Sequence, residues 1–194
     1  MKKYLKYIIF IAIIIIIIIG LNWKDKSEIT AIIKIKDYGN IKVKLDKSNA
    51  PITVDNFVKL SKNKFYDNLT FHRIIDGFMI QGGDPLKNGT GNGDQKIKGE
   101  FKNNGVNNLL KHKRGTISMA RSSDYNSGSC QFFIMQKDNE SLDGNYAAFG
   151  NVISGIEIVD KIVENVSKYG DENGLIPEEY QPIIETIEII EKSN

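Results

Sequence analysis

The stretch FHRIIDGFMIQGGD, residues 71–84, contains two apolar runs separated by Asp76-Gly77, a dipeptide typical of β-hairpin turns. Arg73 and Gln81 are therefore expected on paired strands. A two-residue loop would point their side chains to opposite faces, whereas a three-residue loop over 76–78 would place Arg73 directly across from Gln81. Because strand faces alternate with a period of two, one residue of register decides between these arrangements.

Outward from this hairpin, the chain alternates between short apolar patterns and turn residues. Between residues 82 and 108 the sequence is rich in Gly and Asn and has little periodicity, which predicts a long functional or mobile loop. Many short strands and two helices without βαβ alternation favour an antiparallel sheet or barrel with a helix at each end. The predicted elements are a hairpin over 28–46, helices over 50–61 and 154–166, and strands over 115–120, 131–136, 147–152 and 182–191.

The N-terminal segment differs from the rest of the chain. Residues 7–23 carry no charge and include seven consecutive isoleucines. As a helix they would reach about 25 Å, near the short limit for crossing a bilayer. We expect a signal anchor over 1–23, a linker over 24–28 and a folded domain over 29–194. A cleaved signal peptide is the main alternative, although residues 20–23 offer no A-x-A cleavage pattern, and a buried core helix is the third.

The lysines of this segment predict its orientation. Lys2, Lys3 and Lys6 precede the apolar run, so the N-terminus is expected in the cytoplasm of a single-pass membrane protein, with the domain outside. Cleavage would instead give a secreted protein. The whole chain has a net charge of +2, but without these three lysines 23 basic residues face 24 acidic ones. That balance gives no basic surface for nucleic acid.

The remaining residue patterns exclude several kinds of chemistry. His72 and His112 are far apart in the sequence and no C-x-x-C pattern occurs, so we expect no metal site. Cys130 precedes an apolar run and is interpreted as a small buried residue. The glycines over 89–93 match neither a dinucleotide fingerprint nor a P-loop, and we expect no cofactor.

With these sites excluded, the remaining candidate residues are typical of an apolar pocket with hydrogen-bond donors at its entrance. They comprise Arg73 and Gln81, with His72 beside them, and the apolar side chains Phe78, Met79 and Phe133. Taken residue by residue, however, the pattern favours the simpler interpretation, in which Phe78, Met79 and Phe133 are ordinary core residues and Arg73 forms a surface pair.

Five motifs in order resemble a known family. Residues 71–84 look like the signature of the cyclophilins, the peptidyl-prolyl cis-trans isomerases, and the resemblance extends over about residues 28–191. It implies a mainly β fold, a closed eight-stranded antiparallel barrel capped by two helices, with the active face on the outside. The other motifs are SMAR at 118–121, in the form common in bacterial members, QFFI at 131–134, LDG at 142–144 and FGNV at 149–152.

The resemblance implies an isomerase that accelerates rotation about X-Pro bonds of proline-containing polypeptides. Together with the anchor expected over 1–23, it predicts an enzyme for extracytoplasmic protein folding, and we expect a monomer. The resemblance also favours the three-residue turn. A membrane-tethered proline-binding module or holdase chaperone on the same fold is the alternative. The implied catalytic residues are Arg73, His72 and Gln81, and the implied substrate-binding residues are Phe78, Met79, Ala120, Arg121, Gln131, Phe133, Leu142 and Tyr146.

The implied mechanism breaks no bond. The always-protonated guanidinium of Arg73 would donate to the prolyl nitrogen, whose lone pair becomes an acceptor only in the twisted state. Gln81 and backbone groups near 120–121 would hold the flanking carbonyls. His72 would either support the substrate carbonyl or orient its neighbours, and the loop over 89–93 would border the groove for residues preceding the proline.

Four residues, at three places in the chain, depart from the family pattern. Well-studied eukaryotic members carry Trp where this chain has Ser141, and that Trp contributes to binding of cyclosporin, so cyclosporin binding is not expected here. They carry His where this chain has Tyr146, which retains a hydrogen-bond donor. Ser129-Cys130 replaces a Gly-Ser pair, and loss of a glycine predicts a differently shaped loop.

Overall fold

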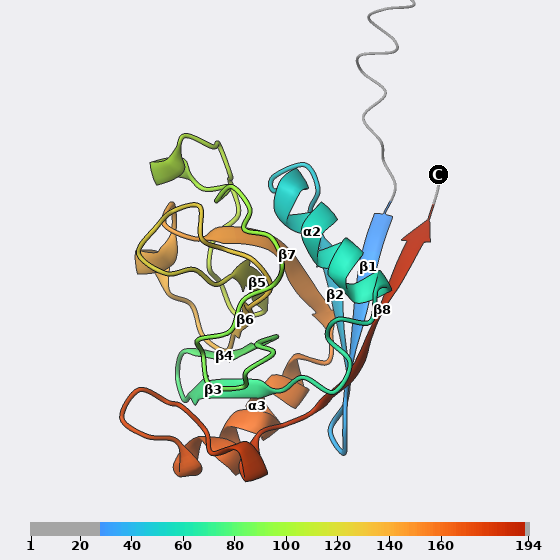
Figure 1. Ribbon diagram of the computed structural model, residues 1–194, viewed down its shortest axis with the longest axis vertical. Helices are drawn as coiled ribbons and strands as arrows, with labels where there is room; N and C mark the ends of the chain where they lie inside the picture. Colours follow the sequence, from blue (N-terminus) through green and yellow to red (C-terminus); the bar gives the residue numbers. More distant parts are fainter. Residues whose placement is uncertain (1–27, 193–194) are drawn as a thin grey trace, which may run out of the picture. The chain divides into compact units, whose positions relative to one another are not determined.

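The computed structural model describes residues 28–192, within which Ile29–Ile190 forms a compact unit. This part of the chain contains eight strands and two α-helices (Figure 1). Their bounds are β1 Glu28–Ile35, β2 Gly39–Leu45, α2 Pro51–Lys62, β3 Phe71–Ile75, β4 Met79–Gly82, β5 Thr116–Met119, β6 Phe132–Met135, β7 Ala147–Ser154, α3 Ile156–Val166 and β8 Ile184–Lys192.

Every element expected over 28–191 is present, with bounds that differ by a few residues. The apolar segment 7–23 and nearly all of the linker lie outside the described residues. Between residues 28 and 192, no helix is both long and apolar enough to span a bilayer.

The first hairpin follows from a period-two pattern. Ile33 faces Ile41 across the β1–β2 pair, and both side chains are fully buried. The intervening lysines of β2, Lys42 and Lys44, are exposed. One face of this hairpin therefore packs on the core and the other meets solvent.

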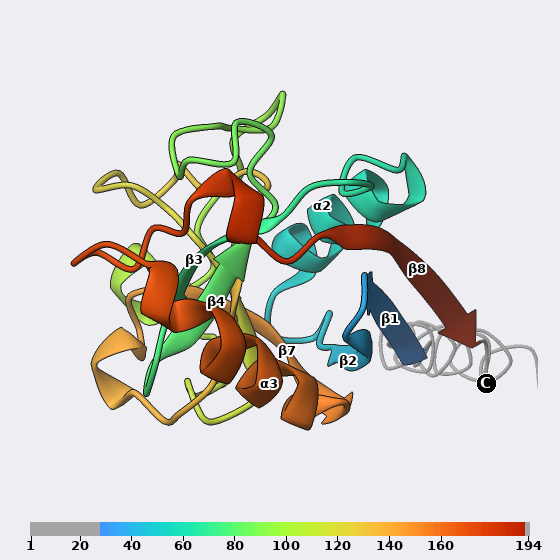
Figure 2. The same cartoon turned by 90° about the horizontal axis from the view of Figure 1, so that it is seen from below.

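The strands form one curled sheet in the order β3-β4-β6-β5-β7-β2-β1-β8. The β1–β2, β2–β7, β3–β4, β4–β6, β5–β6 and β5–β7 pairs are all antiparallel. The sheet encloses a core to which α2 and α3 both contribute buried side chains, and Figures 1 and 2 show these helices on opposite sides of the curled sheet.

The expected closed barrel is wrong in one respect, because β3 and β8 stand at the two ends of the strand order. They approach each other only at the isolated Thr70–Ile183 bridge and the adjoining backbone bonds. The physical reason is competition for the edge of β3. Its backbone pairs instead with the segment before β8, through Ile74 N–H to Gly174 O and Ile176 N–H to His72 O, each 2.8 Å.

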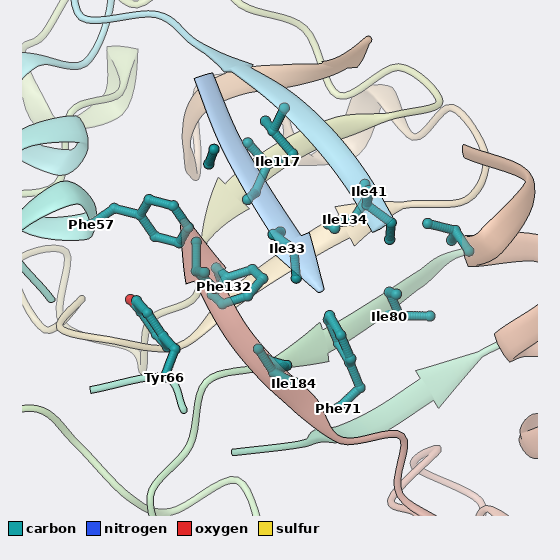
Figure 3. Packing of buried hydrophobic residues seen from close by; sticks show 14 of the residues in the cluster. Ile33, Ile41, Phe57, Tyr66, Phe71, Ile80, Ile117, Phe132, Ile134 and Ile184 are labelled. Atoms are coloured by element: carbon teal, nitrogen blue, oxygen red, sulfur yellow. The ribbon is translucent and has the colours of Figure 1, made fainter. Parts of the chain in front are cut away.

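An aromatic cluster organises the core (Figure 3). The fully buried ring of Phe132 meets Phe57 of α2, Tyr66 and Phe71 edge-on, at centroid distances of 5.4, 5.5 and 6.0 Å. Edge-to-face geometry is favoured because the positive ring edge meets the negative face. The next residue of β6, Phe133, belongs to a separate apolar cluster with Met79 and Met135. Strand β6 thus presents one phenylalanine to the core and the next to the opposite face.

Candidate active site

The 71–84 hairpin has the three-residue turn. Its register pairs Arg73 with Gln81 and Ile75 with Met79, which confirms the arrangement that the resemblance favoured. Gly77 adopts a φ of 72°, the left-handed region open to glycine, and Phe78 N–H closes the turn on Ile75 O at 3.1 Å. Arg73 and Gln81 consequently stand side by side.

A β-bulge at His72 places Arg73 on the outer face. Phe71 pairs with Gly82 and Arg73 with Gln81, so two residues of β3 oppose one of β4. Regular alternation would put Phe71 and Arg73 on the same face. The extra residue instead leaves Phe71 in the core while Arg73 lines a pocket outside it.

This pocket is called the proline pocket after the role that the resemblance implies for its residues, and it has a volume of about 240 Å³. Its floor comes from paired strands, since Gln81 of β4 lies opposite Phe133 of β6. Tyr146 packs edge-on against Phe133 with ring centroids 5.8 Å apart. The lining comprises nine of the predicted site residues, Arg73, Phe78, Met79, Gln81, Ala120, Arg121, Phe133, Leu142 and Tyr146.

Two nitrogens of the Arg73 guanidinium form hydrogen bonds, and the third nitrogen forms none with residues 28–192. Its Nε donates to Asn173 O at 2.8 Å and its Nη1 to Gln81 Oε1 at 3.3 Å. Within residues 28–192, Nη2 has no hydrogen-bond partner and no carboxylate pairs with this arginine. Burial lowers the pKa of Arg73, opposed by Tyr146 and Asp171, but a guanidinium remains charged at neutral pH.

An amide relay connects Arg73 to the neighbouring loop. Gln81 accepts from Arg73 and donates through Nε2 to Gln131 Oε1 at 2.9 Å. Gln131 in turn donates to the carbonyls of Gly89 and Gly91, at 3.2 and 2.8 Å. These bonds fix both amide orientations, so Gln81 presents its oxygen to the arginine. Gln131 lines a second, adjoining cavity of about 310 Å³ rather than the proline pocket.

Sequence reasoning assigned no role to Asp84, the last residue of the signature. Its buried carboxylate accepts from the backbone N–H groups of Leu86 at 2.8 Å, Asn88 at 3.1 Å and Gly89 at 2.6 Å. A Cβ at Gly91 would overlap Asp84 Oδ1. Asp84 therefore shapes the loop that Gln131 holds, and an Asp followed by turn residues is the sequence signal that indicates such a role.

The structure does not bring His72 into either cavity. Its side chain is fully buried, and neither ring nitrogen has a hydrogen-bond partner among the described residues. Burial lowers the pKa of His72, an effect that Asp84 opposes and Arg73 reinforces. The ring lies beneath Gly89, so of the two expected roles this position favours orienting neighbours over contacting substrate.

His112, which sequence reasoning considered only as a metal ligand, supports the pocket from behind. Its Nδ1 lies 3.0 Å from Asp143 Oδ1 and its Nε2 lies 3.0 Å from Ser118 Oγ. The ring stacks on Phe133 with centroids 6.0 Å apart. Burial lowers the pKa of His112, although Asp143 acts in the opposite direction. Across the described range, no three His, Cys, Asp or Glu side chains are grouped to hold a metal ion.

Ser141, Ser129 and Cys130, which depart from the family pattern, are all described by the structure. Ser141 is exposed and donates to Asn139 Oδ1 at 2.6 Å, outside the proline pocket. Ser129 does not have a positive φ, so the expected change of loop shape from losing a glycine is not required. Cys130 is buried, as interpreted.

Comparisons with known proteins agree with this geometry. The family model for cyclophilin type peptidyl-prolyl cis-trans isomerases matches residues 30–188. Peptidyl-prolyl cis-trans isomerase A of Dickeya dadantii is 43% identical over 140 residues, covering 68% of this chain and 72% of that protein. A Helicobacter pylori peptidyl-prolyl cis-trans isomerase is 45% identical over 126 residues, covering 64% and 74%. Peptidyl-prolyl cis-trans isomerase-like 2 of Cryptococcus neoformans is 43% identical over 152 residues, which is 76% of this chain but 26% of that longer protein.

A solved structure gives the same result. The crystal structure of a Cryptosporidium parvum cyclophilin type peptidyl-prolyl cis-trans isomerase, determined in the presence of the dipeptide Ala-Pro, superposes with a TM-score of 0.72 and 32% identity. The match covers 85% of this chain and 99% of that one. Family model, relatives and fold therefore agree that the chain belongs to the cyclophilin-type peptidyl-prolyl cis-trans isomerases and is an enzyme of that class.

Proposed function

We propose that the chain catalyses X-Pro rotation in the proline pocket, with Arg73 as the donor that stabilises the twisted state. Rotation about a peptide bond faces a barrier of about 18–20 kcal/mol because resonance must be lost. In the twisted state the prolyl nitrogen gains a lone pair. A donor that binds this lone pair acts on the transition state and not on the ground state, which raises the rate rather than the affinity.

The free end of the Arg73 guanidinium carries this proposal. Asn173 and Gln81 occupy Nε and Nη1, so the orientation of the planar group is fixed before substrate arrives. Nη2 remains available for a hydrogen bond into the pocket. A carboxylate partner would compete for this donor, and within residues 28–192 Arg73 forms no salt bridge.

The rest of the pocket would hold the substrate while one side of the bond turns. Phe78, Met79, Phe133 and Leu142 supply an apolar seat for the prolyl ring. The N–H of Ala120 already donates to Gln131 O at 2.9 Å, so the role of holding a flanking carbonyl falls to Arg121 N–H and Gln81. The fit to proline-containing polypeptides is supported by the Ala-Pro dipeptide present with the Cryptosporidium relative.

Isomerisation of a proline tetrapeptide, followed by NMR exchange, tests the mechanism. Arg73→Ala should lower kcat/KM about 100-fold or more, the size expected for removing a transition-state donor. Arg114→Ala serves as a matched control, because Arg114 pairs with Asp160 outside the pocket. Retention of activity within twofold by Arg73→Ala would refute the assigned role. A wild-type chain that binds the peptide without isomerising it would favour the tethered binding module or holdase.

The setting of the enzyme is also a proposal. The uncharged run at 7–23 behind three lysines supports a single-pass anchor with the isomerase domain outside the cytoplasm, and SMAR at 118–121 supports a bacterial-type member. Mass spectrometry of isolated membranes should recover the intact N-terminus. A mature N-terminus near residues 22–25 in the soluble fraction would instead establish cleavage and secretion.

A further inference from the structure

The cavity that adjoins the proline pocket, here called the polar groove, differs from it in chemistry. Its volume is about 310 Å³, and its lining combines the loop over 89–92 with amide and hydroxyl side chains. The charged side chains in the lining are Lys96 and Arg121, and the lining contains no carboxylate. Gln81, Ala120 and Arg121 line both cavities and form the wall between them.

Arg121 is positioned without losing its charge. Its Cζ lies 4.6 Å from the ring centroid of Tyr146, 4.9 Å from that of Tyr125 and 5.3 Å from that of Phe101. Nε donates to Asn145 O at 2.9 Å and Nη1 to Ser122 O at 2.8 Å. Aromatic faces and carbonyls attract a cation but do not neutralise it as a carboxylate would. Among residues 28–192, Nη2 has no hydrogen-bond partner.

Lys96 adds a second positive charge on the loop side. Its backbone position is fixed by the next residue, because Ile97 N–H donates to Gly128 O at 2.8 Å. The Lys96 side chain is exposed and forms no ion pair with any described residue. The neighbouring carboxylates of Asp94 and Asp124 are exposed and do not line the groove.

We propose that the polar groove binds a carboxylate side chain within two residues of the substrate proline, so that the enzyme prefers Glu- or Asp-containing sites. This inference rests on the proposed function, because it assumes that proline occupies the adjoining pocket. An extended peptide advances about 3.3 Å per residue, so a neighbouring side chain reaches across the shared wall. A carboxylate there meets one guanidinium and one ammonium and faces no like charge in the lining.

Pairs of peptides that differ only in Glu against Gln test the preference, with the variable residue one or two positions before or after the proline. At low ionic strength we expect kcat/KM to be about three- to tenfold higher for Glu at one or more of these positions, as two partly exposed ion pairs would give. Added salt should reduce the ratio. A ratio near one at all four positions would overturn the proposal.

Reversing the charge of Lys96 tests whether the preference for Glu peptides arises in the polar groove. Lys96→Glu should reduce the Glu/Gln ratio at least twofold and favour a Lys peptide over the Gln peptide. Lys42→Glu makes the same change of net charge on the exposed face of β2 and should leave the Glu/Gln ratio unaltered. If both variants change the Glu/Gln ratio equally, the preference arises from the net charge of the protein at long range, which would contradict the groove assignment.

Binding measurements separate this proposal from the function on which it rests. If the wild-type chain isomerises none of the peptides, the proposed function fails. NMR titration of the same peptides then decides the inference by itself. Tighter binding of Glu than Gln peptides, lost in Lys96→Glu, would support the polar groove as a carboxylate site, and equal binding would refute it.

Discussion

Replacing Gln81 by Glu tests whether Arg73 must remain free of a carboxylate. Gln81 Oε1 accepts from Arg73 Nη1 at 3.3 Å, and Gln81 Nε2 donates to Gln131 Oε1 at 2.9 Å. Glutamate has almost the same shape, but it presents a negative oxygen to the arginine and a second one to the Gln131 oxygen. The substitution therefore turns a neutral anchor into an ion pair and breaks the relay.

The distance between Arg73 and the introduced carboxylate sets the size of the expected loss of activity. Two unit charges about 3.3 Å apart attract by roughly 5 kcal/mol at an effective dielectric constant of about 20. Lost hydration cancels most of this, which leaves about 1–3 kcal/mol for a half-exposed, hydrogen-bonded pair. The ion pair stabilises Arg73 in the ground state, and Arg73 must give up that stabilisation to donate to the twisted bond. The barrier therefore rises, and kcat/KM should fall about 5- to 150-fold.

The assay is NMR exchange on a proline tetrapeptide that carries no ionisable side chain, with circular dichroism to verify folding. Gln81→Leu removes the amide without adding charge, and Gln95→Glu adds the same charge at an exposed loop position. We expect Gln81→Glu to be slower than Gln81→Leu and Gln95→Glu to resemble wild type. If Gln81→Glu keeps half of the wild-type kcat/KM, the idea that catalysis needs an unpaired Arg73 is wrong.

Two further predictions concern stability. Burial lowers the pKa of both His72 and His112 below the ordinary value of 6.5, so the unfolded chain binds more protons once the pH falls below that value. Urea unfolding should therefore show stability decreasing below about pH 6.5, by at most about 1.4 kcal/mol per pH unit for each histidine, and a slope that His72→Gln leaves unchanged would contradict this. Glu100, from the long loop, accepts from Ile52 N–H at 3.0 Å and from Thr53 N–H and Oγ1 at 2.7 Å each, at the start of α2. Glu100→Ala should lower the free energy of unfolding by about 1–3 kcal/mol because these buried donors lose their partner, and an unchanged urea midpoint would refute that role.

Local patterns predicted the elements because each depends on neighbours in the sequence. Alternation in β1 and β2 identified the first hairpin, and Asp76-Gly77 located the turn of the second. The turn length remained open from the residues alone, since both loop lengths fit the same pattern. The resemblance favoured the three-residue turn, and the pairing of Arg73 with Gln81 confirmed it.

The interactions that complete the site join residues distant in the sequence, so periodicity could not reveal them. Asn173 anchors Arg73 across 100 positions, and Gln131 reaches Gly91 across 40. The contacts of His112 with Asp143 and Ser118 depend in the same way on which strands become neighbours. The bulge at His72 also depends on pairing, because it is defined only when β4 lies alongside.

The sequence by itself determined the order of the elements, because short-range alternation and turn residues encode them. Its resemblance to the cyclophilins, carried by five motifs, indicated the family and the nine residues that line the proline pocket. Tertiary structure decided the rest. The loop before β8 occupies the edge of β3 and so prevents a continuous β3–β8 ladder. The same loop, through Asn173, holds the guanidinium of Arg73, while the bulge turns that side chain out of the core. Both effects arise from backbone groups that find partners only when distant segments meet.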